Sequence, residues 1–202
     1  MEKRNKGSIF VVSAPSGAGK TTLCRQIVKK LDNIRTSVSF TTRQPRPGEV
    51  PDEDYSFVSE IEFNAMVDRG DFVEWARVHG NFYGTSRLQL EELVGAGYDV
   101  LLDIDTQGAR QIRKVFKNAV SVFILPPTMA ELKHRLEGRM SNSAEDMNRR
   151  LERAVDEIRE YKMYDYVIVN DVIKMSLKKL EAIIIAERLR SGKIDPQWIE
   201  NI

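Results

Sequence analysis

The sequence contains a single cysteine and no long apolar run, and its charges nearly cancel. Cys24 has no partner cysteine in the chain, which excludes an internal disulfide and fits a reducing compartment. No apolar stretch approaches the ~20 residues that a membrane-spanning helix needs. With 31 Lys and Arg against 30 Asp and Glu, the formal net charge is +1, so no overall field attracts nucleic acid or a membrane surface. These absences predict a cytoplasmic protein that binds neither.

What the chain does contain fits an ordinary globular enzyme. Its 202 residues are 42% hydrophobic and 30% charged, which is enough for one compact domain with inserted lobes. Apolar strand patterns at Tyr98–Ile104, Ala119–Leu125 and Tyr166–Val169 are separated or followed by helical patterns at Thr106–Phe116, Thr128–Glu137, Ala144–Met163 and Val172–Arg190. This alternation predicts an α/β fold with a parallel sheet flanked by helices on both faces.

Two segments break this alternation. Residues 37–90 are rich in Thr, Arg, Pro, Phe and Tyr, and carry short alternating runs such as Asp54–Val58 and Asp71–Arg77. We interpret them as a small β-rich lobe inserted between core elements. The second interruption, residues 138–143, is polar and joins two helical patterns. The sequence therefore predicts a core with two protruding lobes.

A phosphate-binding loop is predicted near the N-terminus. The apolar run Ile9–Val12 is followed by Ala14, Pro15, Ser16, Gly17, Ala18, Gly19, Lys20, Thr21 and Thr22. Such a loop aims backbone N–H groups at a polyphosphate from the N-terminus of a helix. Lys20 would add a charge for the β- and γ-phosphates, and the Thr21 hydroxyl would hold Mg²⁺. Ala14 departs from the pattern G-x-x-x-x-G-K-[ST]; the alternative is a glycine-rich turn that opens an ordinary helix.

Two further groups of residues have the chemistry of a nucleotide site. Arg43 and Arg46 lie three residues apart on a proline-stiffened loop, where two guanidinium groups can converge on one phosphate with Tyr55 as a neutral donor. Either arginine alone would fit a solvated surface loop. Asp103 and Asp105 end an apolar strand at the carboxyl edge of the sheet, where open α/β folds bind ligands. They could serve Mg²⁺ or a substrate base, or simply end the strand.

Six motifs, in order along the chain, resemble the guanylate kinase family. They are Ser39–Glu49, Phe72–Ala76, Tyr83–Thr85, Leu102–Gly108, Arg135–Arg139 and Val167–Asp171. The resemblance covers all but the C-terminal tail. It implies a P-loop NTPase-type parallel sheet with an inserted β-rich lobe for the nucleoside monophosphate and a helical lid. The implied partition is a core of residues 1–36, 91–137 and 155–202, a GMP-binding lobe of residues 37–90 and a lid of residues 138–154.

The resemblance also implies an acceptor site. It places Arg43, Arg46, Tyr55 and Tyr83 on the phosphate of GMP, and Ser39, Glu74, Thr85 and one or both of Asp103 and Asp105 around the guanine; Glu49 and Gly84 belong to the same motifs. The chemistry supports Glu74, because guanine presents N1–H and its 2-amino group as adjacent donors that one carboxylate accepts. The alternative is an outward polar residue on an edge strand. Its apolar neighbours favour a pocket.

On the donor side, the resemblance implies lid arginines at Arg135, Arg139 and Arg150. Arginines on a closing element stabilise the charge of the transferred phosphoryl group once both nucleotides are bound. The implied catalytic residues are Lys20, Arg46, Arg139 and Arg150, and Asn170 and Asp171 resemble the family's contact with the adenine of ATP. A turn or a helix cap would use the last two residues equally well. No general base is evident.

The expected activity is that of a nucleoside monophosphate kinase in purine metabolism: ATP and GMP give ADP and GDP, with Mg²⁺ on the donor phosphates. Two alternatives remain: an inactive guanylate-kinase-like module that binds phosphorylated peptides, and a P-loop kinase for another small phosphorylated acceptor. Lys20, Thr21 and the lid arginines disfavour the module, which has no use for a donor site. Glu74 and the arginine loop disfavour the other acceptor. The sequence leaves the oligomeric state open.

Overall fold

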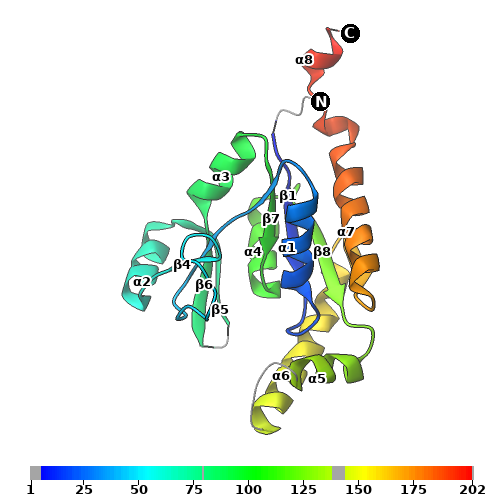
Figure 1. The fold of residues 1–202 in the computed structure, drawn as a ribbon. Helices are drawn as coiled ribbons and strands as arrows, with labels where there is room; N and C mark the ends of the chain where they lie inside the picture. The colour runs from blue at the N-terminus through cyan, green and yellow to red at the C-terminus, as the bar shows by residue number, and fades with distance from the viewer. Residues whose placement is uncertain (1–5, 79, 138–143, 202) are drawn as a thin grey trace.

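The computed structural model describes residues 6–78, 80–137 and 144–201. Its larger sheet has five parallel strands in the order β2-β7-β1-β8-β9. Their bounds are β1 (Ile9–Ser13), β2 (Ile34–Thr36), β7 (Asp99–Asp103), β8 (Val120–Leu125) and β9 (Tyr166–Val169). The sheet stands at the centre of the molecule with helices on both sides (Figure 1). The predicted α/β class with a parallel sheet is confirmed.

The helices are α1 (Lys20–Lys30), α2 (Glu60–Arg69), α3 (Arg87–Gly95), α4 (Thr106–Val115), α5 (Met129–Glu137), α6 (Ala144–Arg159), α7 (Ile173–Arg188) and the short α8 (Pro196–Ile199). Two 3₁₀ turns, η1 (Glu160–Met163) and η2 (Ser191–Lys193), follow α6 and α7. Thr128 caps α5, because its hydroxyl accepts the Glu131 N–H at 3.1 Å. Within the described residues, no helix combines the length and apolarity that crossing a membrane requires.

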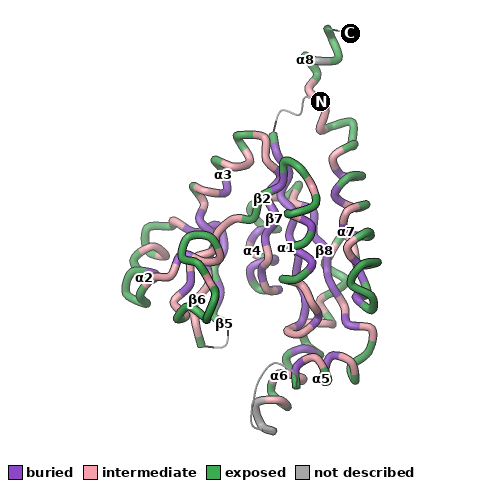
Figure 2. Tube along the Cα trace, in the orientation of Figure 1, coloured by how far each residue is buried: buried purple, intermediate pink, exposed green. Residues whose placement is uncertain are grey.

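The core divides between the two faces of the larger sheet. Phe10 and Val12 of β1 pack with α1 and α7 on one face, whereas Ile9 and Val11 pack with α3 and α4 on the other. This is the period-2 alternation of a strand that is buried on both faces. Figure 2 shows the buried residues concentrated along these central strands. Helices cover both faces of the larger sheet. The edge where its strands end is therefore the place where a ligand can bind.

A second sheet of four strands stands beside the first. Its order is β4-β3-β6-β5, with bounds β3 (Ser39–Thr41), β4 (Tyr55–Phe57), β5 (Phe72–Val78) and β6 (Asn81–Ser86). Phe63 of α2 stacks between Phe72 and Phe82 and gives this sheet its own apolar centre. The strands at Asp54–Val58 and Asp71–Arg77 were predicted, but α2 was not. Only half of its residues are apolar, and Phe63 is the one that is buried.

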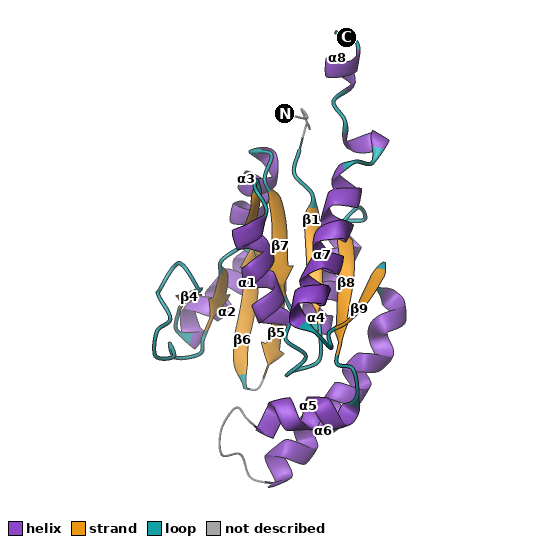
Figure 3. Cartoon of the chain, turned by 45° about the vertical axis from the view of Figure 1, so that its right-hand side comes forward, coloured by secondary structure: helices purple, strands orange, loops and turns teal. Residues whose placement is uncertain are grey.

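Helix α4 joins the two sheets. The side chain of Gln111 bonds both backbone groups of Trp75 on β5, accepting from the N–H at 3.2 Å and donating to the carbonyl at 2.7 Å. Helix α4 is therefore bonded to the β5 edge of the smaller sheet. Helices α5 and α6 form a hairpin around Leu132, Leu136 and Ala154, and extend from one end of the core (Figure 3). The polar link at residues 138–143 lies outside the described residues.

Candidate active site

The glycine-rich loop between β1 and α1 has the backbone shape of a phosphate cradle. Gly17 and Gly19 have φ values of 90° and 92°, which L side chains rarely adopt. The Ala18 N–H donates to the Pro15 carbonyl at 3.1 Å and closes a turn within the loop. Ala14 is buried in the core cluster, and Asn33 and Asp52 are the described non-glycine residues with positive φ. Ala14 therefore has an ordinary conformation, and the missing glycine leaves the loop shape intact.

Lys20, the first residue of α1, points to the end of β7. Its ammonium lies 2.8 Å from an Asp103 carboxylate oxygen and donates to the Ile104 carbonyl at 2.7 Å. Burial disfavours the charge, but nearby groups, Asp103 chief among them, together more than offset this, and the pKa of Lys20 lies above its usual value. The pairing of Val12 with Asp103 in the sheet register sets this contact. Lys20 is held charged and oriented at the carboxyl edge of the sheet.

Donor-side and acceptor-side residues meet in one cavity of about 180 Å³. It is lined by Lys20, Thr21, Ser39, Tyr55, Glu74, Ala76, Val78, Tyr83, Asp103, Ile104 and Asp105. These residues come from α1, from the end of β7 and from strands β3 to β6 of the smaller sheet. The cavity thus places the candidate phosphate lysine beside the candidate guanine carboxylate.

Glu74 is a buried carboxylate on the wall of this cavity. It is 4% exposed and accepts a hydrogen bond from the Thr85 hydroxyl at 2.5 Å. A shift of register between Phe72 and Glu74 breaks the strand alternation, so that Glu74 faces inward opposite Thr85. Burial raises the pKa of Glu74 to about 7, although the bond from Thr85 opposes the rise. Near neutral pH this group is poised between its charged and neutral forms.

Gly108 on α4 makes room for this carboxylate. A Cβ built at this position would clash with Glu74 Oε2, so a larger residue here would push the carboxylate away from Thr85. Asp105, the first residue of the Asp-Thr-Gln-Gly turn, caps α4: its carboxylate accepts the Gly108 N–H at 2.9 Å. Asp103 and Asp105 both line the cavity, but Asp103 pairs with Lys20 and Asp105 holds the start of the helix.

The arginine loop is organised around Glu49. Its carboxylate takes two parallel bonds from the Arg43 guanidinium, both at 2.9 Å, and a third from the Arg46 backbone N–H at 2.7 Å. This pairing with Arg43 lowers the pKa of Glu49. Arg43 also lies over the Tyr55 ring, 5.2 Å from its centre, and Tyr55 packs edge-on to Tyr83. Glu49 therefore orients the Arg43 guanidinium. The Arg46 side chain, in contrast, is exposed to solvent.

The residues predicted to flank the donor come from α5, from α6 and from the segment after β9. Arg135 of α5 donates to the backbone carbonyl of Asn170 at 3.2 and 3.1 Å, and the Asn170 side chain is turned inward under the loop. Asp171 is exposed. Arg150 of α6 lines a second cavity of about 230 Å³ together with Ser16 of the loop. Arg139 lies outside the described residues.

Glu157 of α6 is a site residue that sequence analysis missed. It lines the second cavity with Ser16 and Arg150, and faces the Ser16 backbone N–H. Burial, followed by the charge of Asp105, raises the pKa of Glu157 to about 7. The signal that could have found it is helical spacing: Glu157 is seven residues after Arg150 and so lies on the same face of α6.

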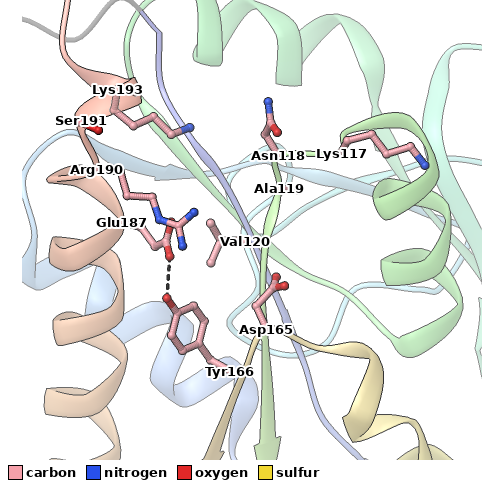
Figure 4. Close-up of a pocket in the computed structure, with 11 residues that line it drawn as sticks. Lys117, Asn118, Ala119, Val120, Asp165, Tyr166, Glu187, Arg190, Ser191 and Lys193 are labelled. Carbon is pink, nitrogen blue, oxygen red and sulfur yellow. Dashed lines mark hydrogen bonds and ion pairs between the residues drawn. The ribbon is translucent and has the colours of Figure 1, made fainter.

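A larger hollow of about 740 Å³ lies at the opposite end of the sheet (Figure 4). Its most buried charge, Glu187, is satisfied internally: the Tyr166 hydroxyl donates to it at 2.6 Å, and Arg190 pairs with it at 3.0 Å. The strands begin here, whereas open parallel sheets bind ligands where their strands end. Chemistry, rather than volume, therefore selects the smaller cavity at Lys20 as the candidate active site.

A parallel sheet in which a strand leads into a glycine-rich loop, with a lysine held at the start of the following helix, is the arrangement of the P-loop NTPases. Comparison with known proteins agrees. The family model described as guanylate kinase matches residues 6–187. The guanylate kinase of Geobacter sulfurreducens is 52% identical over 191 residues, 95% of this chain and 94% of that protein.

Two further relatives give the same result. The guanylate kinase of Geobacter metallireducens is 50% identical over 191 residues, with 95% and 94% of the two chains covered. The crystal structure of guanylate kinase from Anaplasma phagocytophilum superposes with a TM-score of 0.80 at 38% identity, covering 96% of this chain and 92% of that one. The chain belongs to the guanylate kinase family, and the expected class of nucleoside monophosphate kinase is confirmed.

Proposed function

We propose that the protein transfers the γ-phosphoryl group of ATP to GMP, forming ADP and GDP. One observation carries the proposal: Glu74, a buried carboxylate, lines the same cavity as Lys20 of the phosphate loop. The carboxylate can accept both adjacent donors of guanine, N1–H and the 2-amino group. Adenine offers an acceptor at N1 and has no 2-amino group, so the same carboxylate rejects it.

The smaller sheet holds GMP in this proposal. Arg43, oriented by Glu49, and Arg46 take the phosphate with the hydroxyls of Tyr55 and Tyr83. Thr85 fixes the carboxylate of Glu74, and Ser39, Gly84 and the Asp103–Asp105 turn complete the surroundings of the base. The acceptor phosphate carries its own nucleophilic oxyanion. The transfer therefore needs positioning and charge stabilisation more than a general base.

The loop Ala14–Thr22 holds ATP through backbone N–H groups and Lys20, with Arg135 and Asp171 around the donor and Asn170 beneath the loop. The Thr21 hydroxyl and the carboxylates of Asp103 and Asp105 line one cavity. These are the hard oxygen donors that suit Mg²⁺, directly or through water. Bound there, Mg²⁺ would neutralise charge on the donor phosphates.

We also propose a division of labour along the chain. Residues 1–36, 91–137 and 155–202 form the core, residues 37–90 the GMP-binding lobe and residues 138–154 the lid. Closure of the lid brings Arg139 and Arg150 to the transferred phosphoryl group and excludes water. The near-neutral charge and the single cysteine support a cytoplasmic location.

A coupled assay of ADP release tests the function. ATP is supplied with GMP, AMP, CMP or UMP in turn, and turnover with GMP alone is the expected result. Equal turnover with another monophosphate would move the protein to a different acceptor. A lack of turnover with all four, together with binding of a phosphorylated peptide, would favour the interaction module.

A further inference from the structure

The side chain of Asn170 lies beneath the phosphate loop instead of projecting into the nucleotide site. Asn170 directly follows β9 and is 3% exposed. Its side-chain nitrogen donates to the Ala18 carbonyl at 2.7 Å, across 152 residues of sequence. Its side-chain oxygen is buried and has no partner among the described residues. The whole amide is thus enclosed by protein.

We propose that Asn170 is a positioning residue that aims the loop's N–H groups at the donor phosphates. The proposal rests on the proposed function and deepens it. The peptide unit between Ala18 and Gly19 is planar and trans, so its carbonyl and its N–H point in opposite directions. Asn170 binds the carbonyl from the core side. The Gly19 N–H is therefore turned away from the core, toward the concave side of the loop.

The conformation of Gly19 supports this role. Gly19 has a φ of 92°, and a Cβ at this position would lie 2.5 Å from the side-chain nitrogen of Asn170. The asparagine therefore fits directly against the loop, and a side chain at residue 19 would displace it. The requirement for glycine arises both from the backbone angle and from the approach of Asn170.

Asn170 also supports the donor-side arginine. Arg135 donates two N–H groups to the Asn170 backbone carbonyl, while its Nε donates to Glu131 at 2.8 Å. The backbone N–H of Asn170 in turn donates to the Leu125 carbonyl at 2.7 Å. The loop carbonyl and the Arg135 guanidinium are thus both attached to one residue, which is itself fixed to the sheet.

A polyphosphate that lacks a nucleobase can distinguish a positioning role of Asn170 from a direct contact with the adenine of ATP. Inorganic tripolyphosphate and ATP are bound to the wild-type protein and to Asn170→Ala, and the dissociation constants are measured without turnover. We expect Asn170→Ala to weaken both ligands by a similar factor of about tenfold or more, because the Ala18 carbonyl loses its buried partner. The KM for GMP should stay within about twofold, while kcat/KM for ATP falls.

Ser176→Ala is the matched control. Ser176 is buried beside the same strand end, and its hydroxyl donates to the Val169 carbonyl at 3.3 Å, away from the loop. Both ligands should bind this variant within about twofold of wild type. If Asn170→Ala does not fold, Asn170→Ser, which removes the amide with a smaller loss of volume, gives the same comparison.

Two results would overturn the proposal. Weaker ATP binding with unchanged tripolyphosphate binding would make Asn170 a reader of the base. Unchanged binding of both ligands would remove any role in the loop. Because the binding measurement requires no turnover, it stands apart from the ATP:GMP assay, in which an inactive wild-type protein would instead refute the proposed function.

Discussion

Under the proposed function, the two halves of the candidate site bind their ligands in different ways. The donor half presents a loop whose backbone N–H groups and single lysine are held in place by groups of the larger sheet, Asp103 and Asn170. The acceptor half presents side chains, chiefly Glu74 of β5 and Arg43 of the loop that follows β3, from the four-stranded sheet. Backbone groups suit any polyphosphate, whereas a carboxylate of fixed position reads one base.

We propose from this difference that the larger sheet provides affinity for phosphates and the smaller one provides selectivity for the base. It also separates the expected effects of mutation. Changes in the loop should lower turnover for every acceptor, and changes around Glu74 should alter the ranking of acceptors. Four substitutions and one titration test that separation.

The largest effect is expected for Lys20→Met. We expect turnover to fall about 100- to 1,000-fold or more, because a charge held at the donor phosphates is lost. GMP binding should persist, since Lys20 acts on the donor half. ADP release and GMP titration check both statements. Lys29→Met, an exposed change on the same helix, should leave both unchanged. A folded Lys20→Met protein with near-normal turnover would refute the loop assignment.

Glu74→Gln should change acceptor ranking. The amide places a donor against a donor of guanine, which should cost roughly 2–4 kcal/mol, or about 30- to 1,000-fold in kcat/KM for GMP. IMP lacks the 2-amino group and should lose less, and AMP should stay poor with both proteins. The measurement is kcat/KM for the three acceptors. A loss for GMP of less than about threefold, or an equal loss for IMP, would move base selection to Asp103 or Asp105.

Glu49→Gln tests whether Arg43 needs its partner. A neutral amide accepts fewer bonds from the guanidinium, so Arg43 should be less ordered and the KM for GMP should rise about tenfold. kcat should change less. Asp71→Asn is the control, because it breaks the exposed pair of Arg69 and Asp71 in the same lobe and should alter the KM by less than about twofold. Equal KM values for the two variants would contradict the role of Glu49.

The smallest expected effect is that of Gly108→Ala. In an exposed helix this change stabilises a protein by up to about 1 kcal/mol, but here the new methyl group meets the Glu74 carboxylate. We expect kcat/KM for GMP to fall about fivefold, with the KM for ATP unchanged. Gly95→Ala has open space around its Cβ and should leave kinetics unaltered. If Gly108→Ala behaved like Gly95→Ala, Glu74 would not be confined as described.

The larger sheet could be predicted from sequence because its strands are continuous apolar runs and its loop is a local motif. Ile34–Thr36 was missed, since only one residue of this strand is buried. The site contacts that the sequence did not foretell are non-local. The bond from Asn170 to Ala18 joins distant segments, and the inward turn of Glu74 depends on a register shift between β5 and β6. No periodicity within one segment encodes either feature.

The ionisation of Glu74 makes both its contribution to stability and the affinity for GMP depend on pH. Its pKa is about 7 in the folded protein against an ordinary 4.5, so between these values the folded state keeps a proton that the unfolded chain has lost. The contribution of Glu74 to stability is therefore fully present below pH ~4.5 and is lost as pH rises through ~7. Guanine needs the ionised carboxylate, so GMP binding at pH 6 must expel this proton, and GMP affinity should decline as pH falls below ~7.

Proton release on GMP binding tests the central assignment most directly. Calorimetric titrations of GMP at pH 6, in two buffers of different ionisation enthalpy, give the number of protons released by wild type and by Glu74→Gln, each at concentrations matched to its affinity. The difference cancels the titration of the GMP phosphate itself. We predict that wild type releases about one proton more than Glu74→Gln. Equal release by the two proteins would contradict the reading of guanine by Glu74.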